Sequence, residues 1–363
     1  EAGSGSGPAP TPTDFSFGDI ASYAVCGCCG HYHSAFDGEI GAIFGNDRGG
    51  SGSNGKVSFN PLEASAQLGR ANVSWSDGAL GQAGTVTFAF RSTAPTTLPS
   101  DITGFSRFTE TQVAATLLAM ASWSDVANIT FQRVDDEAVP SGYSNNATIL
   151  LGNYAEGANG SAAFAYLPAN RVVTANSGDV WINNTLNYNA TPVPLGYGQQ
   201  VLVHELGHSI GLLHPAPYNA SDGVSITYSN DAIYFEDSRQ YTVMSYFSER
   251  NTGGDNVVAG TQRYSAVPLL DDIAAAQRLY GANTTTRTGD TVYGFNSNAD
   301  RAWFQAVSSA STLIFAVWDA GGVDTFDFSG YDQNQTIDLR QGGFSSVGGL
   351  RANVSIAVGA TIE

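Results

Sequence analysis

The chain has 363 residues, of which 42% are hydrophobic and 11% aromatic, a composition that excludes a disordered protein and favours two globular domains. Its net charge of −18 argues against nucleic acid as a partner, because a phosphate backbone would be repelled. No apolar run approaches the roughly 18 residues of a membrane span, so we expect a soluble protein without a membrane partner. The surplus carboxylates fit either solubility or calcium binding.

Regular patterns begin after a Gly-, Ser- and Pro-rich start at residues 1–13, which predicts flexibility. Alternating apolar residues predict strands at 85–90, 129–134, 147–154, 162–168 and 179–184. Helices are predicted at 108–127, 198–212 and 268–282. The first should be amphipathic, with Thr109 and Gln112 spaced for a capping box. The third should start at Pro268 and stop at Gly281.

After residue 282 the sequence is rich in turn residues, is typical of β-strands and has no helical periodicity. This change indicates a domain boundary near residue 283. Further strands are predicted at 291–298, 311–319, 324–330, 336–343 and 353–358. The glycine-rich DAGGVDTFDFSG at residues 319–330 stands alone rather than in a tandem repeat.

The segment HELGHSIGLLH, residues 204–214, holds three of the five histidines of the chain. His204 and His208 are four residues apart in a predicted helix, so both rings can reach one metal ion. Gly211 permits positive φ, and the chain can then turn back so that His214 supplies a third ligand. Three nitrogens leave one position open, as in catalytic zinc sites, and Glu205 lies where a general base for a zinc-activated water belongs.

This HExxHxxGxxH pattern resembles the metzincin endopeptidases, and Pro215 directly after it is similar to the serralysin branch. The segment YTVMSYFSER at 241–250 is similar to the serralysin Met-turn, and the resemblance covers roughly residues 30–363. It implies an α+β metzincin catalytic domain with a mixed sheet and a long active-site helix, followed by the start of a β-roll or β-sandwich. The implied parts are an N-terminal segment at 1–35, a metalloprotease domain at 36–283 and an incomplete calcium-binding domain at 284–363.

The resemblance also assigns roles to single residues. It makes His204, His208 and His214 the ligands of one zinc ion and Glu205 the base, with Tyr246 as a fifth ligand that also stabilises the oxyanion. Met244 would lie beneath the zinc. A packing role is expected for it rather than a chemical one, because a thioether is a soft side chain that fills gaps. Substrate would pair with an exposed strand, and the family places it along Ala163, Phe164, Ala165 and Tyr166.

Calcium ligands are implied in the C-terminal part, where carbonyl and carboxylate oxygens on glycine-rich turns suit this ion. The first site would use the backbone oxygens of Arg287, Gly289 and Thr291 together with Asp319, Gly321 and Asp324. The second would use Gly322, Asp324, Thr361 and Glu363. The alternative is that Asp319 and Asp324 are ordinary turn residues. The GGxGxD repeats of serralysins are not in this sequence, either because they were removed or because the protein lacks them.

The implied function is a secreted, bacterial, broad-specificity zinc endopeptidase that acts on proteins and peptides as a monomer. The rival hypothesis is a calcium-dependent binding protein with an inert protease domain, and a third is a latent precursor. Cys26, Cys28 and Cys29 are not explained by the family, and three is an odd number. They could form one local disulfide with a free thiol, bind a second metal with His31 or His33, or place a thiolate on the catalytic zinc.

Overall fold

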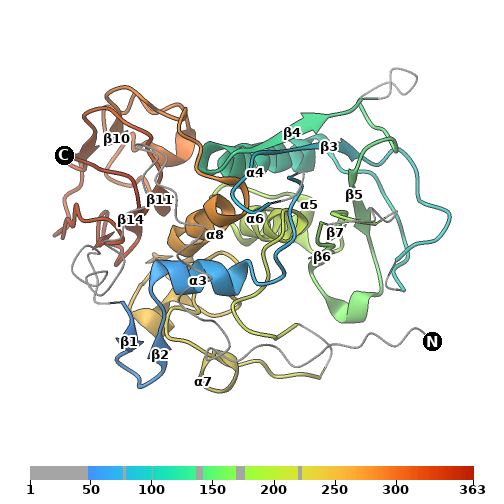
Figure 1. The fold of residues 1–363 in the computed structure, drawn as a ribbon, viewed down its shortest axis with the longest axis horizontal. Helices are drawn as coiled ribbons and strands as arrows, with labels where there is room; N and C mark the ends of the chain where they lie inside the picture. The colour runs from blue at the N-terminus through green and yellow to red at the C-terminus, as the bar shows by residue number, and fades with distance from the viewer. Residues whose placement is uncertain (1–47, 77–78, 100, 136–141, 169–175, 220–222) are drawn as a thin grey trace.

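The computed structural model describes residues 48–76, 79–99, 101–135, 142–168, 176–219 and 223–363 (Figure 1). Its strands are β1 (Gly50–Ser51), β2 (Val57–Ser58), β3 (Gly84–Phe90), β4 (Ile129–Arg133), β5 (Ile149–Tyr154), β6 (Ala163–Ala165), β7 (Val180–Asn183), β8 (Val257–Val258), β9 (Thr261–Gln262), β10 (Val292–Gly294), β11 (Phe315–Val317), β12 (Thr325–Asp327), β13 (Phe344–Ser345) and β14 (Val354–Ile356). Its α-helices are α3 (Pro61–Leu68), α4 (Glu110–Val126), α5 (Asn187–Ala190), α6 (Tyr197–Ser209), α7 (Tyr228–Asp231) and α8 (Leu270–Tyr280). Short 3-10 turns occupy Ala158–Gly160, Glu249–Thr252 and Ala302–Phe304. Among the described residues, no helix is long and apolar enough to cross a membrane.

A five-stranded mixed sheet forms the first half of the molecule, in the order β4-β3-β5-β7-β6. All five strands predicted between residues 85 and 184 take part in it. Four strands are parallel, and β6 pairs antiparallel with β7 at the edge, where Phe164 lies opposite Trp181. Because β6 is the last strand, its other side has no neighbouring strand within this sheet.

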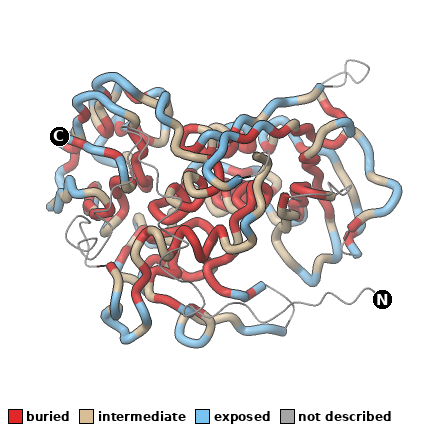
Figure 2. Tube along the Cα trace, in the orientation of Figure 1, coloured by how far each residue is buried: buried red, intermediate tan, exposed pale blue. Residues whose placement is uncertain are grey.

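One continuous cluster of buried residues joins the sheet to α4, α6, α8 and the C-terminal strands (Figure 2). Its largest members include Trp123 from α4 and Tyr280 from α8, both fully buried. The Trp123 indole donates a hydrogen bond to the Val203 carbonyl of α6, 3.1 Å away. Helix α6 is therefore held on the sheet by packing and by a specific polar contact.

Helix α4 begins as predicted, because Thr109 and Gln112 form the reciprocal capping box. The prediction that this helix is amphipathic is wrong. Leu117 and Leu118 are exposed, whereas the polar side chains of Gln112 and Thr116 are buried. Burial of these polar groups is tolerated because each is hydrogen-bonded, Thr116 to the Gln112 carbonyl and Gln112 to Asn153.

Other element boundaries also differ from the prediction. Helix α6 ends at Ser209 rather than residue 212, and α8 starts at Leu270, two residues after Pro268. Residues 336–343 do not form the predicted strand, since Asp338 binds the Arg340 backbone N–H and side chain in a tight turn. Helix α3 has no counterpart in the sequence prediction.

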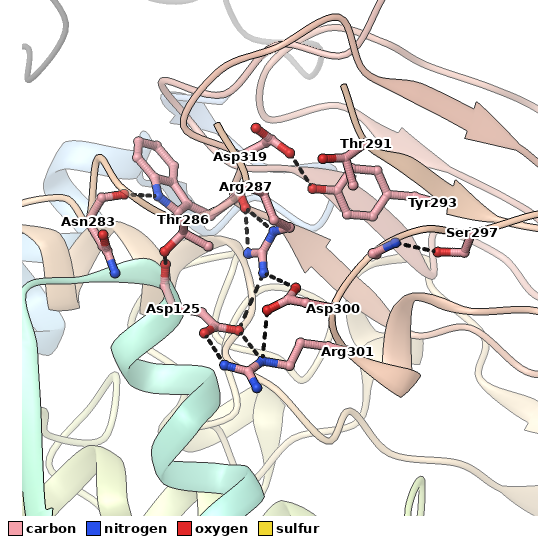
Figure 3. Close-up of polar contacts among 12 residues, drawn as sticks. Asp125, Asn283, Thr286, Arg287, Thr291, Tyr293, Ser297, Asp300, Arg301 and Asp319 are labelled. Carbon is pink, nitrogen blue, oxygen red and sulfur yellow. Dashed lines mark hydrogen bonds and ion pairs between the residues drawn. The ribbon is translucent and has the colours of Figure 1, made fainter. Parts of the chain in front are cut away.

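The C-terminal residues form two small sheets of short strands, β10-β12 and β11-β14-β13. An ion-pair network joins them to the end of α4 (Figure 3). Asp125 accepts two hydrogen bonds from Arg301, at 2.7 and 2.9 Å, and lies 3.4 Å from the Arg287 guanidinium. Arg287 also donates to the Trp318 carbonyl at 2.7 Å, while Asp300 pairs with both arginines at an exposed position.

Asp125→Ala should destabilise the fold, because it removes the buried partner of two arginines and leaves the Arg287 side chain without its inner carboxylate. We expect a loss of roughly 3 kcal/mol in the free energy of unfolding, measured by urea denaturation followed by tryptophan fluorescence. The matched control is Asp300→Ala, which removes the exposed carboxylate of the same network and should cost below about 1 kcal/mol. Equal effects of the two substitutions would contradict a special role for the buried carboxylate.

Candidate metal centre and active-site cleft

Helix α6 presents His204 and His208 one turn apart on the same face. Gly207 lies between them on a neighbouring side of the helix. A Cβ atom at this position would be 2.6 Å from the Met244 sulfur, so glycine is required for the close approach of the Met-turn. Met244 is fully buried against the helix, as the sequence analysis predicts for its packing role.

Gly211 ends the helical segment with φ of +115°, which confirms the predicted left-handed turn. A side chain here would also clash, because a Cβ atom would lie 2.3 Å from the Val73 carbonyl oxygen. The turn is closed by hydrogen bonds from the Gly211 N–H to the His208 carbonyl and from the Leu212 N–H to the Gly207 carbonyl, both 2.9 Å long. The chain then returns His214 to the face of α6 that carries the other two histidines.

The three imidazoles meet through their Nε2 atoms. The Nε2 atom of His214 is 3.1 Å from that of His204 and 3.1 Å from that of His208. They form the one group of three or more metal-binding side chains in the described part of the chain. This geometry brings together the predicted ligand set.

Each imidazole is oriented by a backbone carbonyl that accepts a hydrogen bond from its Nδ1 atom. The acceptors are Val243 for His204 at 2.8 Å, Leu212 for His208 at 2.7 Å, and Tyr218 for His214 at 2.7 Å. A carbonyl oxygen can only accept, so Nδ1 carries the proton and Nε2 presents its lone pair. Three lone pairs therefore point at one another.

Burial lowers the pKa of all three histidines and keeps the rings neutral near pH 7. The pKa is lowered to about 3 for His204 and to about 4 for His208, and it falls well below the ordinary value for His214. Mutual repulsion adds to the effect of burial at His204 and His214. Neutral imidazole is the form that binds a metal ion.

Glu205 is 6% exposed, and its Oε2 atom has no hydrogen-bond partner. Burial raises the pKa of this carboxyl to about 8. An unpartnered carboxylate oxygen in a buried position is costly unless a ligand meets it. Glu205 thus offers a free acceptor atom beside the histidines, and its role as a base stays a prediction.

A cleft of about 510 Å³ opens over the three histidines and Glu205. Its wall includes strand β6, and Ala163, Phe164, Ala165 and Tyr166 all line it. Tyr246 also lines the cleft, with its ring centroid 4.6 Å from that of His214. The predicted substrate strand, base and tyrosine are therefore brought to one cavity with the metal centre.

Two buried carboxylates that sequence reasoning missed support this centre. Asp272, at the start of α8, accepts hydrogen bonds from the Thr242 hydroxyl and from the Val243 and Leu269 N–H groups. Through Val243 it fixes the carbonyl that orients His204. Only the capping pattern at the start of α8 could have drawn attention to this aspartate.

Asp237 acts on the opposite side of the centre. It accepts hydrogen bonds from the Tyr218 hydroxyl at 2.8 Å and from the Ser245 hydroxyl at 2.6 Å. Tyr218 in turn supplies the carbonyl for His214 and stacks on its ring, with centroids 5.4 Å apart. Asp237 has no sequence signal, because its partners lie in different segments.

The residues predicted to bind calcium cluster around β10 and β12. Asp324 accepts a hydrogen bond from the Thr291 N–H and donates its own N–H to Glu363. Asp319 accepts hydrogen bonds from Tyr293 and from the Gly321 N–H.

The predicted calcium ligands are closely packed. Gly322 approaches Gly289 so closely that a Cβ atom would lie 2.6 Å from its carbonyl. Burial raises the pKa of Asp324 to about 6, and the nearby carboxylates of Asp319 and Glu363 add to the rise. Of the remaining predicted ligands, Arg287 points its side chain to the network in Figure 3, and Thr361 is exposed near the end of the chain. Calcium binding by these residues stays a prediction.

The cysteine hypotheses concern Cys26, Cys28, Cys29, His31 and His33, all of which lie outside the described residues.

A mixed sheet with an antiparallel edge strand above a helix that carries the metal-binding histidines defines a metzincin-type catalytic domain. The family model "Matrixin" matches residues 103–230, and the model "Peptidase M10 serralysin C terminal" matches residues 282–363. The chain belongs to the serralysin family of metalloproteases.

Three relatives illustrate this membership. Metalloprotease AprA of Pseudomonas entomophila is 49% identical over 324 residues, which cover 87% of this chain and 64% of the relative. Serralysin C of Dickeya chrysanthemi is 46% identical over 348 residues, which cover 95% of this chain and 69% of the relative. A serralysin of a Photorhabdus strain is 51% identical over 281 residues, which cover 77% of this chain and 55% of the relative. The chain thus spans about two thirds or less of the length of these curated relatives.

Asp272→Ala should weaken both the fold and the metal centre, because it leaves two buried N–H donors unpaired and frees the Val243 carbonyl. We expect the free energy of unfolding to fall by roughly 2–4 kcal/mol and zinc affinity to fall about 10- to 100-fold. Zinc affinity is measured by competition with a chromogenic chelator. Asp332→Ala, at an exposed position, is the control and should leave both values unchanged. Unaltered zinc affinity in Asp272→Ala would show that the Val243 carbonyl is placed without this carboxylate.

Proposed function

We propose that the chain is the catalytic part of a zinc-dependent endopeptidase that hydrolyses internal peptide bonds of proteins. One observation carries the proposal. Three Nε2 lone pairs converge in a cleft that also contains the unpartnered Oε2 atom of Glu205. Buried polar atoms in proteins normally have hydrogen-bond partners, so these free acceptor atoms are evidence for a bound ligand.

The residues fit a zinc ion. Unprotonated Nε2 atoms 3.1 Å apart cannot hydrogen-bond to one another, so a cation is needed to hold them together. Imidazole nitrogens suit zinc, and three protein ligands leave a position open to the cleft. A zinc ion bound there would supply a Lewis acid that polarises the scissile carbonyl and lowers the pKa of water.

Glu205 would take the proton of the attacking water and later pass it to the leaving amine. It lines the cleft that receives the substrate, and its Oε2 atom has no hydrogen-bond donor among the described residues. Tyr246 would serve as a further metal ligand that swings away and then donates a hydrogen bond to the oxyanion. Its ring is positioned by contacts with His214 and with Tyr218, at centroid distances of 4.6 and 5.0 Å.

The substrate would extend along the outer edge of β6, where it can pair with backbone N–H and C=O groups. Backbone pairing does not depend on substrate side chains, which supports a broad specificity. We further propose that the protein is secreted, monomeric and extracellular in a bacterium. The similarity to bacterial serralysins and the strongly negative charge support this view and argue against a nucleic-acid partner.

Glu205→Gln tests the role of the base, since the amide keeps the size of the side chain but cannot take a proton. We expect casein hydrolysis to fall by a factor of about 10² to 10⁴, with zinc content equal to that of the wild type by elemental analysis. Glu110→Gln, at an exposed position in the first turn of α4, should retain full activity. Equal hydrolysis by Glu205→Gln and wild type would reveal a contaminating protease or a different mechanism.

We also propose that calcium binds at the turns that precede the paired strands β10 and β12, with Asp319 and Asp324 as carboxylate ligands. The support is the clustering of these side chains with the Gly289 carbonyl and with Glu363. Calcium takes six to eight oxygen ligands of this mixed kind.

Asp324→Asn should abolish the stabilisation by calcium. Calcium at about 100 times its Kd adds about 2.7 kcal/mol to the free energy of unfolding through binding to the native state alone. Thermal unfolding with and without calcium measures the shift in Tm, and Asp332→Asn is the control in the same domain. A shift of the same size in Asp324→Asn and wild type would rule out this site.

A further inference from the structure

Asp101 lies at the rim of the active-site cleft and is exposed. Besides the three histidines, the described residues that line this cleft include two with ionisable carboxylates, Asp101 and Glu205, and none that is lysine or arginine. Glu205 is buried at the base of the cleft, whereas Asp101 can meet a substrate side chain. Among the described lining residues, the rim therefore carries one negative charge with no lysine or arginine beside it.

The backbone of Asp101 is held by the segment that leads into β6. The Thr103 N–H donates to the Glu156 carbonyl, and the Ala155 N–H donates to the Thr103 carbonyl, both at 2.9 Å. Gly157, with φ of +98°, approaches so closely that a Cβ atom would lie 2.3 Å from the Asp101 carbonyl oxygen. The backbone at Asp101 is thus placed next to the segment that precedes the substrate strand.

A second, independent feature supports ligand binding in this cleft. The Oε2 atom of Glu205 is buried and has no hydrogen-bond partner among the described residues, and Glu205 lines the same cavity as Asp101. A peptide bound along β6 also lies near the segment next to Asp101, because residues 158, 159 and 161, which precede β6 in the chain, line the same cleft.

We infer that Asp101 is a specificity residue that favours substrates with lysine or arginine near the scissile bond. The inference rests on the proposed endopeptidase function. The net charge of −18 favours the approach of cationic substrates in general, and Asp101 would then select for a cationic side chain at one position. Neutral residues remain acceptable there, because backbone pairing with β6 holds the rest of the peptide.

The chain direction of β6 indicates on which side of the scissile bond Asp101 contacts the substrate. Asp101 lies beside the residues that precede β6, at the N-terminal end of the strand. An antiparallel ladder is the slightly more stable pairing, and it places the C-terminal part of the substrate at that end. The preferred lysine or arginine therefore follows the scissile bond.

The test uses fluorogenic peptides of one sequence, with either Lys or Gln at each of the three positions before and after the cleaved bond. For the zinc-loaded wild type, kcat/KM should be about fivefold higher with Lys than with Gln at one position after the bond, at low salt. The preference should fade as salt rises. In Asp101→Asn the ratio should fall to about one. Asparagine also tolerates the left-handed backbone at this site, where φ is +57°.

Glu156→Gln is the matched control, because this exposed carboxylate lies next to the same segment but does not line the cleft. Its Lys preference should equal that of the wild type. The inference is overturned if the wild type shows no Lys preference, if Asp101→Asn keeps it, or if Glu156→Gln loses it equally. A preference confined to positions before the bond would overturn the antiparallel assignment. Failure of the zinc-loaded wild type to cleave any of the peptides, with Lys or with Gln, would instead refute the proposed function.

Discussion

The convergence of three neutral imidazoles is the constraint on which the rest of the structure depends. Nε2 lone pairs at 3.1 Å repel one another, so each ring must be fixed by its other nitrogen. Three carbonyls do this, and they belong to the Met-turn, to the turn after α6 and to the segment that follows it. The surrounding fold can be understood as the means of holding these carbonyls in place.

Buried carboxylates provide much of that support at an energetic cost. Asp272 satisfies two N–H groups and one hydroxyl, while Asp237 joins Tyr218 to the Met-turn. Burial raises the pKa of both aspartates to about 7, which shows how unfavourable the charged forms are in these positions. Their hydrogen bonds offset this cost and help to orient His204 and His214 in the centre.

The C-terminal strands pack against the rest of the described chain. They share one hydrophobic cluster with α4, α6 and α8, and the Asp125 network adds a polar connection at the end of α4. Arg287 belongs to this network and to the segment predicted to bind calcium. The predicted calcium site and the helix that packs on α6 are therefore physically connected, although the boundary near residue 283 stays a prediction.

The sequence by itself determined the three histidines, Glu205 and the turn at Gly211, because all are encoded by spacing within one helix and the turn that follows it. The five strands of the main sheet were also predictable from their alternation. Sequence reasoning failed for α4, where the tertiary structure buries hydrogen-bonded polar groups and leaves two leucines exposed. Only the tertiary structure selected Asp272, because a residue far away in sequence gains its role from the backbone groups that packing brings beside it.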